Sequence, residues 1–359
     1  MRGRNARRSR RAALFTSLTA LALTAAACAS NAPQDALKPV GPVARQEDNL
    51  FRPVFWIAVA VFVLVEGGLL FIVRRFRRRT FADAPKQIHG NKRLEIMWTI
   101  IPAALLAAIA IPTVVTIWDV AAAPTGDVLH VNVTGHQWWW EYEYTDFKTS
   151  NGTNLKTANE LVIPTGRWVY LSMTSKDVIH SYWIPKLAGK QDVIPNRTTH
   201  LKLRADQTGV YRGQCAEFCA ISHANMRARA IAQSPADFDR WVEGQLRPAP
   251  MPTDPQVFSR LTTTCAACHT IRGILVNGQE AVAGQIGPDL THLGSRTSFG
   301  GSTFELTAAN LARWIDNPTA MKPLTGTFPN DMNKPSMPDY GLSQSEIDAI
   351  VAYLMSLKG

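Results

Sequence analysis

Two cysteines, a histidine and a methionine fall within twelve residues, in Cys215-Ala-Glu217-Phe-Cys219-Ala-Ile-Ser-His223-Ala-Asn-Met226. Thiolate, imidazole and thioether side chains together favour copper, zinc or an iron–sulfur cluster. Zinc does not favour a thioether, and an iron–sulfur cluster would need more cysteines. A mononuclear blue-copper site uses one cysteine, so the second one indicates a pair of coppers that share both thiolates.

Such a pair of coppers still lacks an imidazole. The best candidate is His180, in Asp177-Val-Ile-His180-Ser-Tyr-Trp-Ile-Pro185 at the end of an expected strand. Five other histidines have no such context and are treated as ordinary: His89, His130, His136, His200 and His292. The alternative is a structural disulfide between Cys215 and Cys219, which an oxidising compartment permits. It would leave the spacing of His223 and Met226 unexplained.

A second motif, Cys265-Ala-Ala-Cys268-His269, is the attachment sequence of a c-type haem. In that motif both cysteines form thioethers with the vinyl groups, and the histidine binds the iron. A thioredoxin-like redox pair is the alternative, but it needs a βαβ context. The sequence around this motif is helical instead, so we expect haem.

The helices expected around the haem motif are Pro255–Thr264, Leu306–Asp316 and a last one that begins at Ser343. Ser343 and Glu346 have the spacing of a capping box. The segment between the two motifs, Arg247-Pro-Ala-Pro-Met-Pro-Thr-Asp-Pro255, is a proline-rich, semi-stiff linker. We therefore divide this part of the chain into a linker at 247–255 and a haem domain at 256–359.

Short alternating strands are expected around residues 215–226, here called the copper loop, without helices between these strands. They are Val128–Val133, Trp138–Tyr144, Trp168–Met173, Thr198–Leu203, Val210–Gln214 and Arg227–Ala232. This pattern predicts an all-β sandwich or barrel over residues 120–246. Ser234 then caps a short helix that has Pro235 in its first position.

Two apolar runs precede the strands within residues 28–119. Residues 54–73 carry one charge, Glu66, and residues 96–118 carry none. Each run is long enough to cross a bilayer core of about 30 Å. The loop between them holds eight basic residues against a single Asp83: Arg74, Arg75, Arg77, Arg78, Arg79, Lys86, Lys92 and Arg93. By the positive-inside rule this loop is cytoplasmic, and both ends of the chain lie outside.

Residues 1–27 have the pattern of an export signal, with a basic start followed by the apolar run Ala12–Ala27. The run ends in Ala25-Ala-Ala-Cys28, which resembles the lipobox of bacterial lipoproteins, whose cysteine is acylated. The alternative is an ordinary cleavage site with Cys28 as a bystander. Arg10-Arg11 also permits a twin-arginine signal.

A formal charge of +10 is typical of nucleic-acid-binding proteins, but the distribution of this charge excludes a nucleic-acid partner. The excess lies in the leader and in the basic loop. From Asp119 to the end, 21 Lys and Arg stand against 22 Asp and Glu, a net of −1. The bulk of the protein therefore lacks a surface that could release phosphate counterions.

The copper loop, His-Ser-Tyr-Trp-Ile-Pro, a tryptophan-rich strand and two membrane spans together resemble cytochrome c oxidase subunit II over roughly residues 50 to 245. The resemblance implies a cupredoxin-like domain with the binuclear centre called CuA. The ligand side chains would be His180, Cys215, Cys219, His223 and Met226. Glu217 would bind through its backbone carbonyl, and its side chain would face Mg²⁺ at the boundary with subunit I, near Asp192.

The same resemblance gives roles to two residues that physical reasoning treats as ordinary. Glu95, otherwise a dipole partner at a helix start, would lie at the mouth of a proton channel in subunit I. Trp138, the first of three tryptophans in Gly135-His-Gln-Trp138-Trp-Trp140, would be exposed and would accept electrons from cytochrome c. Two departures, Ala220 and Asn196, stand where glycine is common and put only local turn geometry in doubt.

The last 105 or so residues resemble cytochrome c. The resemblance implies that Met337, in Lys334-Pro-Ser-Met337-Pro-Asp-Tyr340, is the sixth iron ligand, with Met321 and Met332 as alternatives. Gly287-Pro288-Asp-Leu290 resembles the segment that packs against the proximal histidine. All five cysteines then have a role: one carries lipid, two bind copper and two bind haem.

Together these features predict subunit II of a haem–copper oxidase with its own cytochrome c, in a bacterial plasma membrane with both redox domains outside. Electrons would pass from the haem to CuA and on to subunit I, where oxygen is reduced and protons are translocated. Expected partners are subunits I and III, membrane lipid and an upstream cytochrome or quinol–cytochrome c reductase. The alternatives are a copper-delivery or electron-shuttle lipoprotein and, more weakly, a quinol oxidase subunit. A nitrous oxide reductase would need a propeller domain, for which the chain has no room.

Overall fold

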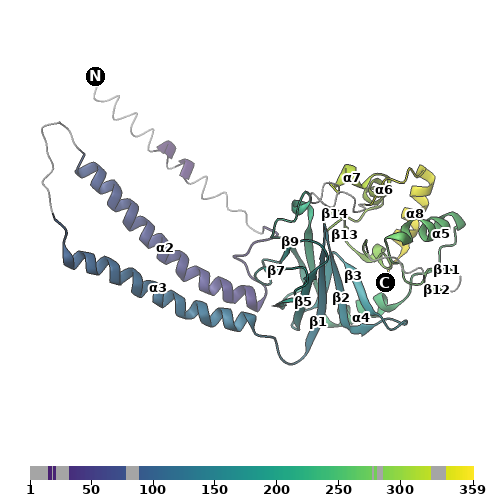
Figure 1. Ribbon diagram of the computed structural model, residues 1–359, viewed down its shortest axis with the longest axis horizontal. Helices are drawn as coiled ribbons and strands as arrows, with labels where there is room; N and C mark the ends of the chain where they lie inside the picture. Colours follow the sequence, from purple (N-terminus) through teal and green to yellow (C-terminus); the bar gives the residue numbers. More distant parts are fainter. Residues whose placement is uncertain are drawn as a thin grey trace, which may run out of the picture.

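The computed structural model describes residues 15–17, 19–21, 32–77, 89–276, 279–280, 286–324 and 337–359. Two long helices are followed by a β domain and then by a helical C-terminal domain that lies beside it (Figure 1). Three parts of the sequence predictions lie outside the described residues: most of the leader with Cys28, the basic loop from Arg78 to Lys86, and Met332.

The two apolar runs form α2 (Pro42–Arg75) and α3 (Lys92–Ala121), which lie side by side as a hairpin (Figure 1). Both helices extend beyond the predicted spans because their polar ends remain helical. At the start of α2, Val43 and Ala44 are buried against the β domain. At the start of α3, the Asn91 side chain accepts hydrogen bonds from two backbone N–H groups, and Glu95 lies in the first turn. Among the described residues, these two helices are long and apolar enough to cross a membrane.

The β domain consists of two five-stranded sheets, as predicted from the alternating strands. One sheet has the order β3-β2-β1-β5-β8, with β1 Val128–His136, β2 Trp139–Lys148, β3 Asn154–Ala158, β5 Trp168–Ser175 and β8 Thr199–Leu203. The other has the order β4-β10-β9-β6-β7, with β4 Glu160–Pro164, β6 His180–Trp183, β7 Gln191–Val193, β9 Gly209–Cys215 and β10 Arg227–Gln233. Strands β1 and β5 are parallel, as are β4 and β10, and the other neighbours are antiparallel.

Alternate side chains of the two sheets point inward to form one core. Along β5 every second residue is buried, and the large side chains of Trp140, Tyr142, Tyr144 and Tyr182 are fully buried. The phenol of Tyr144 donates to the Val162 carbonyl at 2.8 Å, which satisfies a polar group inside the apolar core. This packed core supports the copper loop, which connects β9 and β10.

The linker packs against the C-terminal domain. Helix α4 (Pro235–Leu246) begins at the predicted cap, where the Ser234 side chain accepts from the Asp237 N–H. Beyond α4, the Arg272 guanidinium donates to the carbonyls of Gln245, Leu246 and Arg247 at 2.6, 2.8 and 3.1 Å. The Ala249 N–H donates to the Arg272 carbonyl at 2.8 Å. The buried Arg272 therefore holds the chain in place where α4 ends and the linker begins.

The C-terminal domain contains α5 (Pro255–Thr263), α6 (Ala308–Asp316), α7 (Pro318–Met321) and α8 (Gln344–Ser356), with the short pairs β11 (Leu275–Val276)–β12 (Gln279–Glu280) and β13 (Ser298–Phe299)–β14 (Phe304–Glu305). The capping box predicted for α8 is present, with Ser343 and Glu346 bonded reciprocally. Apolar faces of α5, α6 and α8 meet in a core that includes Leu261, Leu311 and Ile350.

Candidate metal centres

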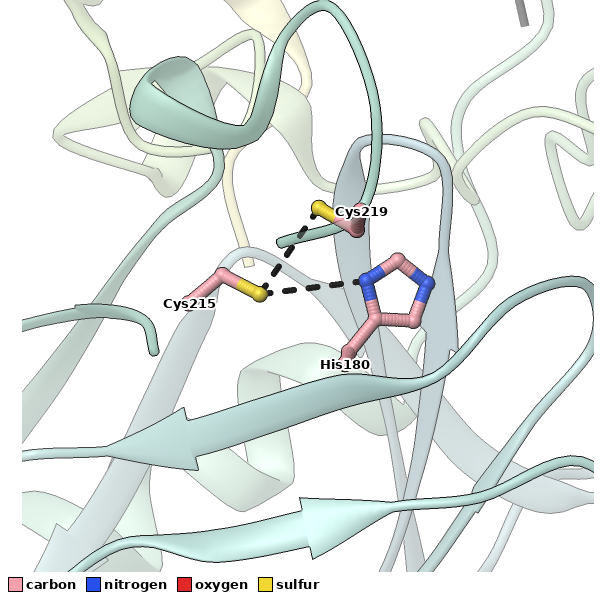
Figure 2. Close-up of side chains that lie close together, drawn as sticks. All are labelled: His180, Cys215 and Cys219. Carbon is pink, nitrogen blue, oxygen red and sulfur yellow. Dashed lines mark hydrogen bonds between the residues drawn. The ribbon is translucent and has the colours of Figure 1, made fainter. Parts of the chain in front are cut away.

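Strands β6 and β9 bring two distant parts of the sequence together at one end of the β domain. Their register places Tyr182 opposite Cys215, so His180 and the start of the loop after β9 face the same point. The ligand atoms of His180, Cys215 and Cys219 all lie within 4.8 Å of one another, and all three residues are buried (Figure 2). The two Sγ atoms are 3.8 Å apart, and the Cys215 Sγ is 3.9 Å from the His180 Nδ1.

The sulfur atoms are too far apart for a disulfide, whose S–S bond is about 2.05 Å. Both cysteines are free. The disulfide alternative is therefore wrong for this structure. Two thiols that approach without bonding, beside an imidazole nitrogen, fit a soft metal.

The remaining loop residues predicted as ligands also converge on this point. The His223 Nδ1 lies 3.6 Å and the Met226 Sδ 3.9 Å from the Cys219 Sγ, while the Glu217 carbonyl oxygen lies 3.2 Å from the Cys215 Sγ. Glu217 itself is exposed. Thiolate, imidazole, thioether and carbonyl donors thus surround one buried space.

The two thiols share a proton. The pKa of the Cys215 thiol is lowered to about 3 because the neighbouring Cys219 thiol donates to its thiolate. The same contact raises the pKa of Cys219, since its proton is held between the two sulfurs. One negative charge is thus present in this pair at neutral pH, and a metal would displace the second proton.

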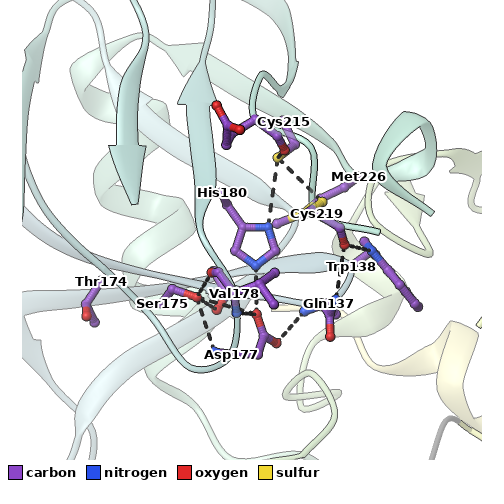
Figure 3. Close-up of polar contacts among 12 residues, drawn as sticks. Gln137, Trp138, Thr174, Ser175, Asp177, Val178, His180, Cys215, Cys219 and Met226 are labelled. Carbon is purple, nitrogen blue, oxygen red and sulfur yellow. Dashed lines mark hydrogen bonds and ion pairs between the residues drawn. The ribbon is translucent and has the colours of Figure 1, made fainter. Parts of the chain in front are cut away.

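A carboxylate orients His180 from behind (Figure 3). Asp177 accepts from the His180 Nε2 at 2.8 Å, from the Val178 N–H at 2.7 Å and from the Gln137 N–H at 2.7 Å. Burial alone would raise the pKa of Asp177, but the hydrogen bonds from His180, Val178 and Gln137 and the charge of His180 together outweigh burial and lower that pKa. Burial alone would lower the pKa of His180, and the bonds to Asp177 and Cys215 raise it instead. With its Nε2 bonded to Asp177, His180 presents its Nδ1 to the thiols.

Trp138 lies against the copper loop. Its indole Nε1 donates to the Cys219 carbonyl at 2.7 Å, and the Gln137 side chain donates to the same oxygen at 3.1 Å (Figure 3). The expectation that Trp138 is exposed is wrong: only 3% of its surface is accessible. Trp138 also lines the cleft that contains the haem motif, so residues of the C-terminal domain lie over it.

The haem motif lines a cleft that opens to solvent, between the C-terminal domain and the β domain. Cys265, Cys268, His269 and Met337 all line it, and both cysteines are free. The mainly apolar lining suits a large flat group such as haem. Met321 packs against the core of the C-terminal domain and does not line the cleft.

The orientation of His269 is fixed by the segment predicted to pack on it. Its Nδ1 is 2.8 Å from the Pro288 carbonyl oxygen, which leaves Nε2 available to a metal. A side chain at Gly287 would meet the imidazole ring at 2.6 Å, so only glycine permits this approach. Burial lowers the pKa of His269, which keeps the imidazole neutral and able to bind a metal.

The other residues singled out in the sequence lie at separate places in the fold, and one of them, Ala220, directly follows Cys219. Asp192 is exposed on β7, while Glu66 and Glu95 lie on α2 and α3. Ala220 and Asn196, the two departures from glycine, have φ values of 82° and 60°, the left-handed region that glycine favours. The turn geometry therefore persists despite the side chains.

Sequence reasoning missed two residues beside these centres. Asp177 stands in the quoted motif, and its spacing of three from His180 could have suggested a carboxylate–imidazole pair. Lys322 is buried where the C-terminal domain meets the β domain, and nothing in its local sequence indicated that. His136, treated as ordinary, is buried with its ring stacked on Trp139 at 4.1 Å.

Three models of known protein families match this chain. Cytochrome c oxidase subunit II, transmembrane domain, matches residues 33–115, and its periplasmic domain matches 129–232. Cytochrome c matches residues 257–358.

Two relatives are similar over nearly their whole length. Cytochrome c oxidase subunit 2 of Alkalihalophilus pseudofirmus is 35% identical over 97% of each chain. That of Bacillus sp. strain PS3 is 32% identical over 96% of this chain and 97% of its own. A solved structure of the periplasmic domain of subunit II of cytochrome oxidase from Bradyrhizobium japonicum is 31% identical, with a TM-score of 0.31, over 34% of this chain and 95% of that one.

Proposed function

The chain belongs to the cytochrome c oxidase subunit II family and carries a cytochrome c domain, and from this premise we propose that it passes electrons from its own haem to a binuclear CuA centre. As subunit II of a haem–copper oxidase it works with the other oxidase subunits. Its family domains imply copper in the β domain and haem in the C-terminal domain. The observation that supports the route is a single tryptophan, Trp138, which lines the haem cleft and bonds the copper loop.

The copper centre would use His180, Cys215, Cys219, His223 and Met226 through side chains, and Glu217 through its carbonyl. Their convergence on one buried space supports this assignment. Cys215 and Cys219, which already share one negative charge, would both supply thiolates to the copper pair. Asp177 would keep the His180 Nδ1 directed at the metal.

The haem would be attached through Cys265 and Cys268, with His269 and Met337 as the axial ligands. All four residues line the same cleft. The Pro288 carbonyl would hold the His269 ring in place through its Nδ1. Haem and copper supply the one-electron chemistry, and the residues of this chain attach, orient and shield them.

Trp138 would connect the two centres. Its indole ring borders the haem cleft, and its Nε1 bonds the carbonyl of a proposed copper ligand. Because Trp138 is buried, water is excluded from this contact, and the two domains need no rearrangement before transfer. The fused domain would thus occupy the place of a separate cytochrome c.

The remaining roles follow from the resemblance and the charge pattern. The basic loop between α2 and α3 would lie in the cytoplasm, so both redox domains would lie outside the plasma membrane. Glu95 at the start of α3 would lie at a proton-channel mouth of subunit I, where oxygen reduction is coupled to proton translocation. The exposed Glu217 side chain would reach Mg²⁺ at the same boundary. Cys28 would carry lipid, and an upstream cytochrome or quinol–cytochrome c reductase would supply electrons.

Electron paramagnetic resonance of the copper-loaded, full-length protein tests the proposal. We expect a hyperfine pattern from one electron shared equally by two coppers, together with the optical spectrum of a low-spin c-type haem. A single-copper signal, or none, beside a normal haem spectrum would refute the binuclear centre. The protein would then be a haem protein that carries copper rather than one that conducts electrons through it.

A further inference from the structure

Lys322 has an unusual place at the boundary between the two redox domains. It follows α7 in the C-terminal domain, and only 2% of its surface is accessible. Its ammonium donates to the Trp138 carbonyl at 2.8 Å and to the Gly300 carbonyl at 2.9 Å. The first carbonyl belongs to the β domain and the second to the C-terminal domain, so one side chain joins the two.

Burying this charge is costly. Lysine is almost never fully buried unless it is paired, and no carboxylate forms an ion pair with Lys322 among the described residues. Burial lowers its pKa to about 7, an effect only partly offset by the nearby Cys219. A hydrogen bond from an ammonium to a carbonyl is stronger than a neutral one, and here two such bonds compensate for lost hydration.

The chain around Lys322 is fitted closely to the copper loop. The Arg227 N–H donates to the Gly301 carbonyl at 2.8 Å, and the Thr303 hydroxyl donates to the Asn225 carbonyl at 2.7 Å. The Ser222 hydroxyl donates to the Pro323 carbonyl. The residues that flank His223 and Met226 in the sequence are therefore bonded to residues 300–303 and 322–323.

Glycine is required at the centre of this contact. Gly301 has a φ of 75°, and a Cβ there would lie 2.5 Å from the Trp138 carbonyl oxygen and 2.7 Å from the Lys322 Nζ. The backbone of the C-terminal domain thus approaches the same carbonyl that Lys322 binds. Nothing larger than a hydrogen atom fits between them.

We propose that Lys322 is a positioning residue for electron transfer between the haem and the copper centre. By holding the Trp138 carbonyl to the Gly300 carbonyl, it keeps the indole between the haem cleft and the Cys219 carbonyl. Lys322 lines the haem cleft beside Trp138, and it acts through that tryptophan. This inference rests on the proposed route from haem to copper.

The test uses the full-length protein in detergent with both centres loaded. Haem-to-copper transfer is followed after rapid reduction of the haem, in wild type and in Lys322→Met, Trp138→Phe and the double variant. Lys322→Met should slow transfer about tenfold, the equivalent of roughly one lost charged hydrogen bond. In the Trp138→Phe background the same change should have little further effect, because the indole that Lys322 positions is already gone. Lys358→Met, exposed in the same domain, is the matched control and should change nothing.

A second readout does not depend on loaded centres. In the metal-free protein, the Arg227 amide should exchange its hydrogen faster in Lys322→Met than in wild type, because its bond crosses the same boundary. If Lys322→Met does not fold, Lys322→Gln retains a neutral donor and should give a smaller loss of the same kind.

The possible failures are distinguishable. Unchanged transfer in Lys322→Met, or equal slowing with and without Trp138, would overturn the positioning role, since the latter would indicate general loosening. If the wild-type haem is reduced and the copper never is, the proposed route itself fails. That result would not depend on Lys322.

Discussion

Ser298→Ala is expected to loosen the C-terminal domain from the β domain. The carboxylate of Glu160 in β4 is buried, with 3% of the residue accessible. Its donors come from the C-terminal domain: the Thr297 N–H at 3.1 Å, the Thr297 hydroxyl at 2.6 Å and the Ser298 hydroxyl at 2.6 Å. The substitution removes one of these donors without adding bulk.

A hydrogen bond to a charged group contributes about 1.5–3 kcal/mol, and about 1.4 kcal/mol corresponds to a tenfold change in an equilibrium. The ratio of docked to undocked molecules should therefore fall by about 10- to 100-fold. The lower end applies if the two Thr297 donors shift to compensate. Because Ser298 is fully buried, water reaches the vacated position only when the domains separate.

Hydrogen exchange of the full-length protein in detergent measures this change directly. Peptides that contain β4 and the β13–β14 pair should lose protection by the same factor, while those from the sandwich core should not. The control is Ser259→Ala, an exposed position on α5. If protection at β4 is unchanged, or falls equally in the control, the docking argument fails.

Two further predictions concern the copper side. Asp177→Asn should weaken copper binding about 10- to 100-fold, because the carboxylate that orients His180 loses its charge; a titration against a competing chelator that gives wild-type affinity would contradict it. Burial lowers the pKa of His136 from its ordinary 6.5 to about 4. Between pH 4 and pH 6.5 the unfolded chain therefore binds a proton that the folded chain does not. Stability of the metal-free protein is then fully present above pH 6.5 and falls towards pH 4, by up to about 1.4 kcal/mol per pH unit. His136→Phe keeps the stacking on Trp139 and should flatten this slope in thermal melts; an unaltered slope would assign it to other groups.

The parts of the fold that could be predicted from sequence are those determined by neighbours in the chain. Alternation predicted the strands, and the Ser234 and Ser343 caps marked the starts of α4 and α8 because their partners are three residues away. Four of the five side chains proposed to bind copper lie in one loop, so their spacing alone indicated a metal. The ends of α2 and α3 were placed too far inward because hydropathy measures the span and not the polar turns that continue it.

The contacts between the domains could not be predicted in this way. Glu160 meets Thr297 and Ser298, and Trp138 meets Lys322, across more than a hundred residues of chain. Such contacts depend on how two folded domains pack together. They produce no periodicity and no residue spacing that could be recognised in the sequence. The exposure expected for Trp138 was wrong for this reason. The resemblance implies a tryptophan that a separate cytochrome c contacts, whereas here the fused C-terminal domain covers it.

That covered tryptophan changes how electrons could reach the copper centre. A tether alone would raise the local concentration of the donor to the order of mM, and the donor would still have to find its site. Here Arg272 fixes the linker, and Lys322 joins the two backbones. Among the described residues, the donors to the Glu160 carboxylate come from across the boundary. An external donor cannot reach Trp138, but Ile286 and Tyr340 at the cleft are 51% and 40% exposed. On the proposed function, docking therefore makes the haem the obligatory electron acceptor, and selection among donors moves from the copper domain to the rim of the haem cleft.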